Sequence, residues 1–337
     1  MTDLQRRPFV SARMVAERAG VSRSAVSRTF TDGASVSEAT RRKVLAAAGA
    51  LGYHVNHLAR GLRENSNIVC LVVADLTTPI RAGLVDELTR KLQAASKITM
   101  VINTESDDES VATALRQTLN YRADATIVLS GTPPASLIET CLANGQQVIL
   151  INRADHLQGS QNLGVDNAMG AREAFFLLQR AGCRRLAVVT STARTASLLQ
   201  REDVFVEAAR KAGLDVAVTR AGPTTYASGL EAGRRLFGRS DGPDGVFCVT
   251  DLLALGFMDA ARQEFGLRIP DDVCVVGFDD IEQGGWESYR LTTFAQPLAA
   301  MADHAVDLLA EPHAWGSERK LFEPLPVWRR SVRANSR

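Results

Sequence analysis

The sequence predicts a small all-α head, a short connecting segment and a larger α/β domain built from two similar parallel sheets. Three observations lead to this fold class. Residues 11–30 read as two short capped helices around a tight turn, and beyond residue 67 short apolar runs alternate with amphipathic stretches. Charge is also unevenly placed, because the first 63 residues carry a net charge of +7 and the remainder carries −6. With 337 residues, 45% of them hydrophobic, the chain can bury the cores of more than one domain.

The first two predicted helices are separated by the turn at Ala19, Gly20 and Val21. A serine stands where each helix begins, Ser11 for the first and Ser22 for the second, and a serine hydroxyl there accepts a hydrogen bond from an otherwise unpaired amide. Apolar side chains form a seam between the two helices: Val15, Ala16, Ala19, Val21, Ala25, Val26 and Phe30. This is the sequence shape of a helix-turn-helix.

The opposite face of the second helix is polar. Arg23, Ser24, Ser27 and Arg28 share one side of it, where a guanidinium could reach a guanine edge in the major groove. Any capped amphipathic helix pair would give the same pattern, so the spacing alone leaves a purely structural alternative open.

A third helix is predicted over residues 37–51, with Ser37 as its cap, Glu38 in its first turn and Gly52 as its stop. It would complete a three-helix core. In the stretch that follows, residues 53–62, Leu58 and Leu62 lie one helical turn apart, but such a segment is too short to be a stable helix alone.

Beyond the connecting segment, apolar runs of four to six residues predict the strands of a parallel α/β domain. This alternation of apolar runs with amphipathic stretches occurs twice along the chain, which implies two similar sheets. The predicted strands of the first sheet cover residues 68–73, 98–102, 125–129 and 147–151, and those of the second cover 186–190, 216–219, 245–250 and 274–278. A further strand over residues 291–294 precedes a last helix, Leu298 to Ala310.

Five segments together resemble the lactose-repressor (LacI/GalR) family of bacterial transcription regulators: VAERAGVSRSAVSRTF, GYHVNHLARGL, VDNAMGAREA, CVVGFDDIE and LTTFAQP. They occur in the family's order and span nearly the whole chain. The resemblance implies an all-α helix-turn-helix head plus hinge helix, joined to an α/β type I periplasmic-binding-protein-like domain with two Rossmann-like subdomains. One departure is Val55, which stands where the family often has a proline before the hinge asparagine and predicts a less rigid hinge entry.

The resemblance also sets the expected domain boundaries. The head covers residues 1–52, the hinge 53–66, and the effector-binding and dimerisation domain 67–337. In that domain the amino-terminal subdomain takes about 67–164 and 298–323, and the carboxy-terminal subdomain takes about 165–296 and 325–337. Three crossings between them are expected, near Gly164, Pro297 and Pro324.

Ligands of parallel sheets collect beyond the carboxyl ends of the strands. Polar side chains at those positions, together with those that the resemblance favours, give the candidate effector site: Thr78, Arg81, Ser130, Asn152, Arg153, Arg201, Asp251 and Asp279. Taken singly, each is more readily explained as a helix cap or a loop-closing group, and their shared position at the strand ends is what favours a site. Asp166 and Asn167 are expected to serve the interdomain hinge instead.

The class of effector stays open between neutral and anionic molecules. The family's aromatic residues after the first strand are replaced here by Ile80 and Arg81, although Phe205 and Trp286 could supply an aromatic wall. If Arg81, Arg153 and Arg201 all face the cleft, they favour a carboxylate or phosphate. Asp251 and Asp279 favour a neutral sugar. A sugar, sugar acid or sugar phosphate is therefore the expected small-molecule effector.

These parts imply a mechanism. A homodimer would present two heads to a pseudo-palindromic operator in double-stranded DNA, read by Ser22, Arg23, Ser24, Ser27 and Arg28. Paired hinges would enter the minor groove through Asn56, Ala59 and Leu62, with Leu62 wedged into a base step. Effector binding would change the separation of the hinges. We find no leucine-heptad tail after VWRRSVR, so a dimer is expected rather than a tetramer.

Other function classes are disfavoured. GxGxxG and GxxxxGK[ST] motifs are absent, and no histidine neighbours a plausible nucleophile, so no enzyme and no cofactor are expected. The cysteines, at positions 70, 141, 183, 248 and 274, predict buried reduced thiols, and neither they nor the histidines have metal-ligand spacing. No signal peptide or membrane span is evident, which predicts a cytoplasmic protein. The expected function is a ligand-responsive repressor of a sugar or sugar-derivative operon, and the alternative is a transport-type binding protein without DNA function.

Overall fold

The computed structural model describes residues 10–31, 34–53, 66–105, 107–129, 134–153, 158–238, 241–311 and 319–334. The chain divides into two compact units, Met1–Ser66 and Asn67–Arg337, which are described separately.

The smaller unit contains three helices, α1 (Ala12–Ala19), α2 (Arg23–Thr29) and α3 (Glu38–Leu51). The predicted caps are confirmed, because the hydroxyls of Ser11, Ser22 and Ser37 accept hydrogen bonds from the amides of Met14, Ala25 and Thr40. Gly20 ends α1 with a left-handed φ of +65°, which glycine adopts without steric cost. The predicted seam is also present, since a small core joins Val15, Ala16, Val26, Val44, Ala47 and Ala48.

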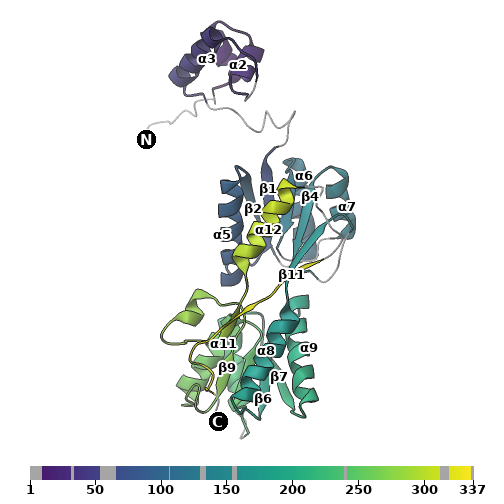
Figure 1. Ribbon diagram of the computed structural model, residues 1–337, viewed down its shortest axis with the longest axis vertical. Coiled ribbons are helices and arrows are strands. Elements are labelled where there is room, and N and C mark those ends of the chain that lie inside the picture. The colour runs from purple at the N-terminus through teal and green to yellow at the C-terminus, as the bar shows by residue number, and fades with distance from the viewer. Residues whose placement is uncertain are drawn as a thin grey trace, which may run out of the picture. The chain divides into compact units, whose positions relative to one another are not determined.

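The larger unit has two parallel sheets in two lobes (Figure 1). The amino-terminal lobe has the strand order β11-β5-β4-β3-β1-β2. Its strands are β1 (Ile68–Ala74), β2 (Ile98–Thr104), β3 (Ala125–Val128), β4 (Gln147–Ile151), β5 (Gln161–Val165) and β11 (Lys320–Phe322). Its helices are α5 (Pro79–Ala94), α6 (Asp108–Asn120), α7 (Ala135–Ala143) and α12 (Leu298–Ala310).

The carboxy-terminal lobe has the strand order β7-β6-β8-β9. These strands are β6 (Leu186–Thr190), β7 (Val216–Arg220), β8 (Gly245–Cys248) and β9 (Cys274–Val276). The helices are α8 (Asn167–Arg180), α9 (Ala196–Lys211), α10 (Tyr226–Phe237) and α11 (Asp251–Asp259), the last continued by a π-helical segment (Ala260–Glu264); a 3₁₀ turn follows at Glu282–Gly285. Two further strands, β10 (Thr293–Ala295) and β12 (Leu325–Val327), pair antiparallel. The predicted fold class is confirmed, and all eight predicted strands of the two sheets form, but β5, β11 and β12 were not predicted.

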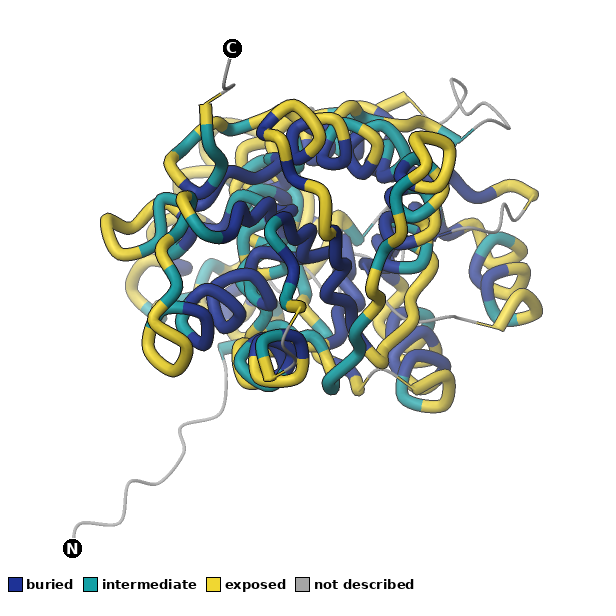
Figure 2. The backbone as a smooth tube through the Cα atoms, turned by 90° about the horizontal axis from the view of Figure 1, so that it is seen from below, coloured by how far each residue is buried: buried dark blue, intermediate teal, exposed yellow. Residues whose placement is uncertain are grey.

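Helices pack on both faces of the amino-terminal sheet, so an apolar core lies on each side of it. Leu71 of β1 belongs to the core shared with α5 and α12, whereas its neighbour Val72 belongs to a second core with α6 and α7. Figure 2 shows the buried backbone concentrated in the interior, with exposed positions on the outer sides of helices and loops. All five cysteines are buried thiols, as predicted. Among the described helices, none combines the length and apolar character needed to span a bilayer.

The chain passes between the lobes three times. It leaves the amino-terminal lobe between β5 and α8, returns between β10 and α12, and leaves again between β11 and β12. Because the strands within each sheet are parallel, the loops at their carboxyl ends gather at one edge. In both lobes these loops border the same cavity.

Candidate functional site

A cavity of about 870 Å³ lies between the two lobes of the larger unit. Its walls come from the loops after β1 and β4 in one lobe, and from those after β6, β7, β8 and β9 in the other. This volume lies within the range of pockets that hold small metabolites.

Six of the eight predicted effector residues line the cavity: Thr78, Arg81, Asn152, Arg153, Arg201 and Asp279. Ser130 lies outside the described residues. Asp251 is not part of the wall.

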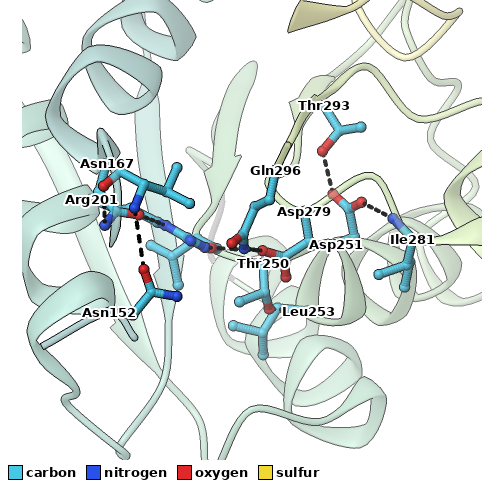
Figure 3. A network of polar contacts seen from close by, with 12 residues as sticks. Asn152, Asn167, Arg201, Thr250, Asp251, Leu253, Asp279, Ile281, Thr293 and Gln296 are labelled. Atoms are coloured by element: carbon cyan, nitrogen blue, oxygen red, sulfur yellow. Dashed lines mark hydrogen bonds and ion pairs between the residues drawn. The ribbon is translucent and has the colours of Figure 1, made fainter. Parts of the chain in front are cut away.

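Arg201 and Asp279 are the most constrained pair in this wall (Figure 3). The Arg201 Nε donates to Asn167 Oδ1 at 2.8 Å, and its Nη1 donates to the Val249 carbonyl at 2.7 Å and to Asp279 Oδ1 at 3.3 Å. Its guanidinium carbon lies 3.5 Å from the centroid of the Phe278 ring. Burial lowers the pKa of Arg201, and the Asp279 carboxylate acts in the opposite direction.

Gln296 supports the same carboxylate from the second crossing. Its Nε2 donates to Asp279 Oδ1 at 2.6 Å. Burial raises the pKa of Asp279, while Arg201 and this amide lower it. Asp279 has a φ of +130°, an unusual value for a non-glycine residue. The Arg201 and Asp279 side chains are therefore held in place without any ligand.

The prediction that Asp251 contacts the effector requires correction. Its Oδ1 accepts from the Thr293 hydroxyl at 2.5 Å and its Oδ2 from the Ile281 amide at 3.0 Å, so it ties the start of α11 to the segments after β9. It is fully buried, which raises its pKa to about 7. The preceding residue, Thr250, lines the cavity instead. Adjacent residues therefore have different roles: Thr250 lines the cavity, whereas Asp251, the first residue of α11, is buried and binds Thr293 and Ile281.

Arg81 and Asn152 enter the cavity from the amino-terminal lobe. The Arg81 Nη1 donates to the Ala74 carbonyl at 2.8 Å and pairs with Asp75 Oδ2 at 2.7 Å. The Asn152 Oδ1 accepts from the Val165 amide at 3.2 Å, next to the first crossing. At that crossing the Asp166 side chain caps α8, and the Asn167 side chain accepts from Arg201 of α9, so of the two expected hinge residues Asn167 joins two helices through its side chain.

The suggested aromatic wall is wrong. Phe205 is fully buried in the carboxy-terminal lobe, where its ring stacks on Phe247 with centroids 5.1 Å apart. Trp286 is half exposed and does not border the cavity. Among the described residues that line the cavity, none is aromatic.

Several wall residues escaped the sequence reasoning: Arg194, Thr195, Ser197, Thr224, Thr225, Thr250 and Gln296. β6 ends at Thr190, which is buried and does not line the cavity. The wall begins three residues later, in the loop that leads into α9. Extending the search from each strand end through the first turn of the next helix would have found Arg194 and Ser197.

The smaller unit presents a candidate nucleic-acid interface. On α2 the five predicted DNA-contacting residues are exposed, namely Ser22 at its cap and Arg23, Ser24, Ser27 and Arg28 along one side, while Ala25, Val26 and Thr29 face inward. The Ser22 hydroxyl already serves as the cap and lies 2.9 Å from the Ser24 hydroxyl. Asn56, Ala59 and Leu62 lie outside the described residues.

Comparisons with known proteins agree with this two-unit layout. The profile for bacterial regulatory proteins of the lacI family matches residues 13–56, and the profile for a periplasmic binding protein-like domain matches residues 177–332. Among curated relatives, the transcriptional regulator GalR of Escherichia coli K12 is 28% identical over 94% of each chain. The transcriptional repressor CytR of the same strain is 26% identical over 95% of each chain.

Solved structures give the same result for the fold. The lac repressor dimer bound to operator and an anti-inducer matches with a TM-score of 0.87 at 24% identity, covering 97% of this chain and all of that one. A complex of the transcriptional regulator CelR with cellobiose matches with a TM-score of 0.69 at 28% identity, covering 96% of this chain and all of that one.

Proposed function

This chain belongs to the lacI family of bacterial regulatory proteins, and from that premise we propose that it represses a catabolic operon for a sugar or sugar derivative. It binds DNA as a homodimer through its heads, and a small molecule in the cavity sets its affinity for the operator. One observation carries this proposal: the same chain contains a DNA-binding type of head and a ligand-sized cavity. The head presents the exposed, basic helix α2 on a three-helix core, and the cavity lies in the larger unit.

The head supports sequence-specific binding. Arg23 and Ser24 stand in the first turn of α2, the part of a recognition helix that enters the major groove. Arg28 lies one turn further, and its Nε donates weakly to the Ser24 carbonyl at 3.4 Å. We assign base readout to Arg23 and Ser24, and either base or phosphate contact to Arg28.

The cavity supports regulation because its walls come from both lobes. A ligand that contacts both lobes favours one relative arrangement of them, and its differential affinity for the two arrangements sets the response. We assign ligand contact to Thr78, Arg81, Asn152, Arg153, Arg201 and Asp279, with Thr250 in place of Asp251. Coupling to DNA runs through residues 53–66, which connect the two units and include the predicted minor-groove residues.

The test is selection of duplexes by the purified full chain from a library of randomised inverted repeats, followed by fluorescence anisotropy on the selected site. We expect a palindromic site bound at least a thousandfold more tightly than random duplex. Equal affinity for random and selected duplex, with and without sugars and sugar derivatives, would refute the proposal and favour a transport-type binding protein. The same scheme places the protein in the cytoplasm with its DNA and assigns it no catalytic step.

A further inference from the structure

We propose that the molecule recognised in the cavity is a polyhydroxylated compound that carries a carboxylate or a phosphate, bound at the wall formed by Arg194 and the first turn of α9. The inference rests on the proposed function, because it names the ligand class of the same cavity. Three observations favour a charged ligand over a neutral sugar: the arginines of the wall, the helix start that lines it, and the lack of aromatic side chains among its described residues.

The described wall carries an excess of positive charge. Four arginines line it, at positions 81, 153, 194 and 201, against two carboxylates, Asp75 and Asp279. Each carboxylate already has an arginine partner in the wall: Asp75 pairs with Arg81 at 2.7 Å, and Asp279 pairs with Arg201 at 3.3 Å. Arg194 has no acidic partner among the described residues, so a ligand with a negative charge would balance it where a neutral one would not.

Arg194 is the arginine best placed to bind such a charge. It is exposed at the cavity wall, and no acidic residue of the described chain pairs with it. Its φ of +47° is left-handed, an unusual conformation for a residue other than glycine. An arginine with its guanidinium still available can form the paired hydrogen bonds that carboxylate and phosphate oxygens accept.

The helix that follows strengthens the same wall. Ala196–Lys211 forms α9, a helix of 16 residues, and its start from Thr195 to Leu198 lines the cavity. The first turn of a helix presents amides without partners inside the helix, and the helix dipole favours an anion there. Thr195 makes no side-chain capping bond, so its hydroxyl, like that of Ser197, can bind a ligand oxygen.

The rest of the wall fits a hydroxylated body. Hydroxyl and amide side chains contribute to it from both lobes, including Thr77, Asn152, Thr224, Thr225 and Gln296. Since no described wall residue is aromatic, binding cannot draw on a ring stacked against a sugar face. A charged group on the ligand would add a strong orienting contact to these hydrogen bonds, and sugar acids and sugar phosphates carry such a group.

The experiment is isothermal titration of the purified full chain with four probes: D-glucose, D-gluconate, D-glucose 6-phosphate and orthophosphate. We expect at least one of the three anions to bind tenfold or more tightly than glucose, and its affinity to fall as sodium chloride is raised. Gluconate and the two phosphates distinguish a carboxylate from a phosphate as the recognised group.

Two variants locate the site. Arg194→Gln should weaken the anion tenfold or more, whereas Arg116→Gln, which removes an exposed arginine of α6 away from the cavity, should leave the affinity unchanged. The inference is overturned if glucose binds as tightly as the anions, if none of the three anions binds, or if Arg194→Gln has no effect. Operator binding by the same preparations is measured separately, so failure of this inference is distinguishable from failure of the regulator proposal.

Discussion

Arg201 and Asp279 form an ion pair in which both side chains are only 5% exposed, yet both also border the ligand cavity. Arg201 comes from α9 and Asp279 from the segment after β9, so the pair joins two elements of the carboxy-terminal lobe. Burying two charges is costly, and only their mutual contact and further hydrogen bonds offset the cost. The pair therefore links the wall of the cavity to the stability of the lobe.

Removing one charge of this pair should be strongly destabilising. We expect Asp279→Asn to lower the free energy of unfolding by about 3–5 kcal/mol, because Arg201 would stay buried without its carboxylate. The matched control is Asp280→Asn, since Asp280 pairs with Arg329 at 2.7 Å in a partly exposed position. Its loss should cost less than about 1 kcal/mol. Urea unfolding measures both, and equal losses would contradict the assigned burial of the first pair.

Asp251 should make stability depend on pH. Burial raises its folded-state pKa from 3.8 to about 7, and the nearby Asp279 and Asp280 carboxylates act in the same direction. Between these values the folded chain keeps a proton that the unfolded chain has released, so the contribution of Asp251 to stability falls as pH rises from about 4 to about 7.

The variant Asp251→Asn lacks this titration but can keep both contacts, with its amide donating to the Thr293 hydroxyl. Relative to the unmodified chain, its unfolding free energy should improve as pH rises through this window, by at most about 1.4 kcal/mol per pH unit. Chemical denaturation at several pH values measures the difference, and a difference that does not vary with pH would show that Asp251 is charged throughout.

Helices α10 and α11 pack so closely that glycine is required between them. A Cβ at Gly256 would lie 2.0 Å from the Tyr226 carbonyl oxygen, and one at Gly229 would lie 2.1 Å from the Leu253 carbonyl oxygen. We expect Gly256→Ala to lower the unfolding free energy by about 2 kcal/mol or more, as overpacking does. Gly49→Ala on α3, where a Cβ meets no atom within 4 Å, should be neutral or stabilising by up to about 1 kcal/mol. Calorimetric unfolding compares the two, and a neutral Gly256→Ala would argue against this packing.

Arg23 should determine base preference rather than general affinity. Arg23→Gln is expected to change the preferred base at one symmetric pair of operator positions, costing about 1–3 kcal/mol on the original site. The exposed Arg42 on α3 provides the control, since Arg42→Gln should leave base preference unchanged. Selection from a randomised operator library measures preference, and a uniform loss over all sequences would reassign Arg23 to the phosphate backbone.

Leu62 is predicted from sequence alone to wedge between base pairs. Leu62→Ala should weaken binding to the selected operator while sparing binding to random duplex, because only the specific complex gains from a kinked minor groove. Anisotropy titrations on both duplexes test this. Unchanged operator affinity would remove the wedge from the mechanism.

The sequence predicted the head closely because its signals are local. Capping serines, a glycine stop and a helical apolar period act within a few residues, and Ser11, Ser22 and Gly52 occupy the predicted positions in the structure. The inner strands β1, β3, β6 and β8 were equally readable, because a strand buried on both faces needs a continuous apolar run.

Strand β5 shows where such reading fails. Its sequence QNLGV contains two amide side chains and a glycine, yet all five residues are buried. The Asn162 amide donates to the Arg153 carbonyl, and the Arg319 guanidinium would lie 2.6 Å from a Cβ at Gly164. Partners from β4 and from residues more than 150 positions away make this strand possible, and no local pattern reveals them.

The candidate site was predictable in its location and not in its details. Strand ends pointed to Thr78, Asn152 and Asp279, and these line the cavity. The roles of Thr250 and Asp251 depend on where a helix begins to within one residue. The burial of Phe205 depends on which face of α9 packs against Phe247. Both the helix start and this packing are set by tertiary contacts, which the local sequence pattern does not show.

The three passages between the lobes constrain how the chain can be synthesised and folded. The amino-terminal lobe takes α12 and β11 from residues 298–322, which leave the ribosome only after the other lobe's main sheet has been made. Its parallel sheet therefore cannot be completed early in translation, whereas β6 to β9 can assemble first. A nascent chain of this protein should present the unfinished edge at β5 to chaperones until residues 320–322, which form β11, have been synthesised.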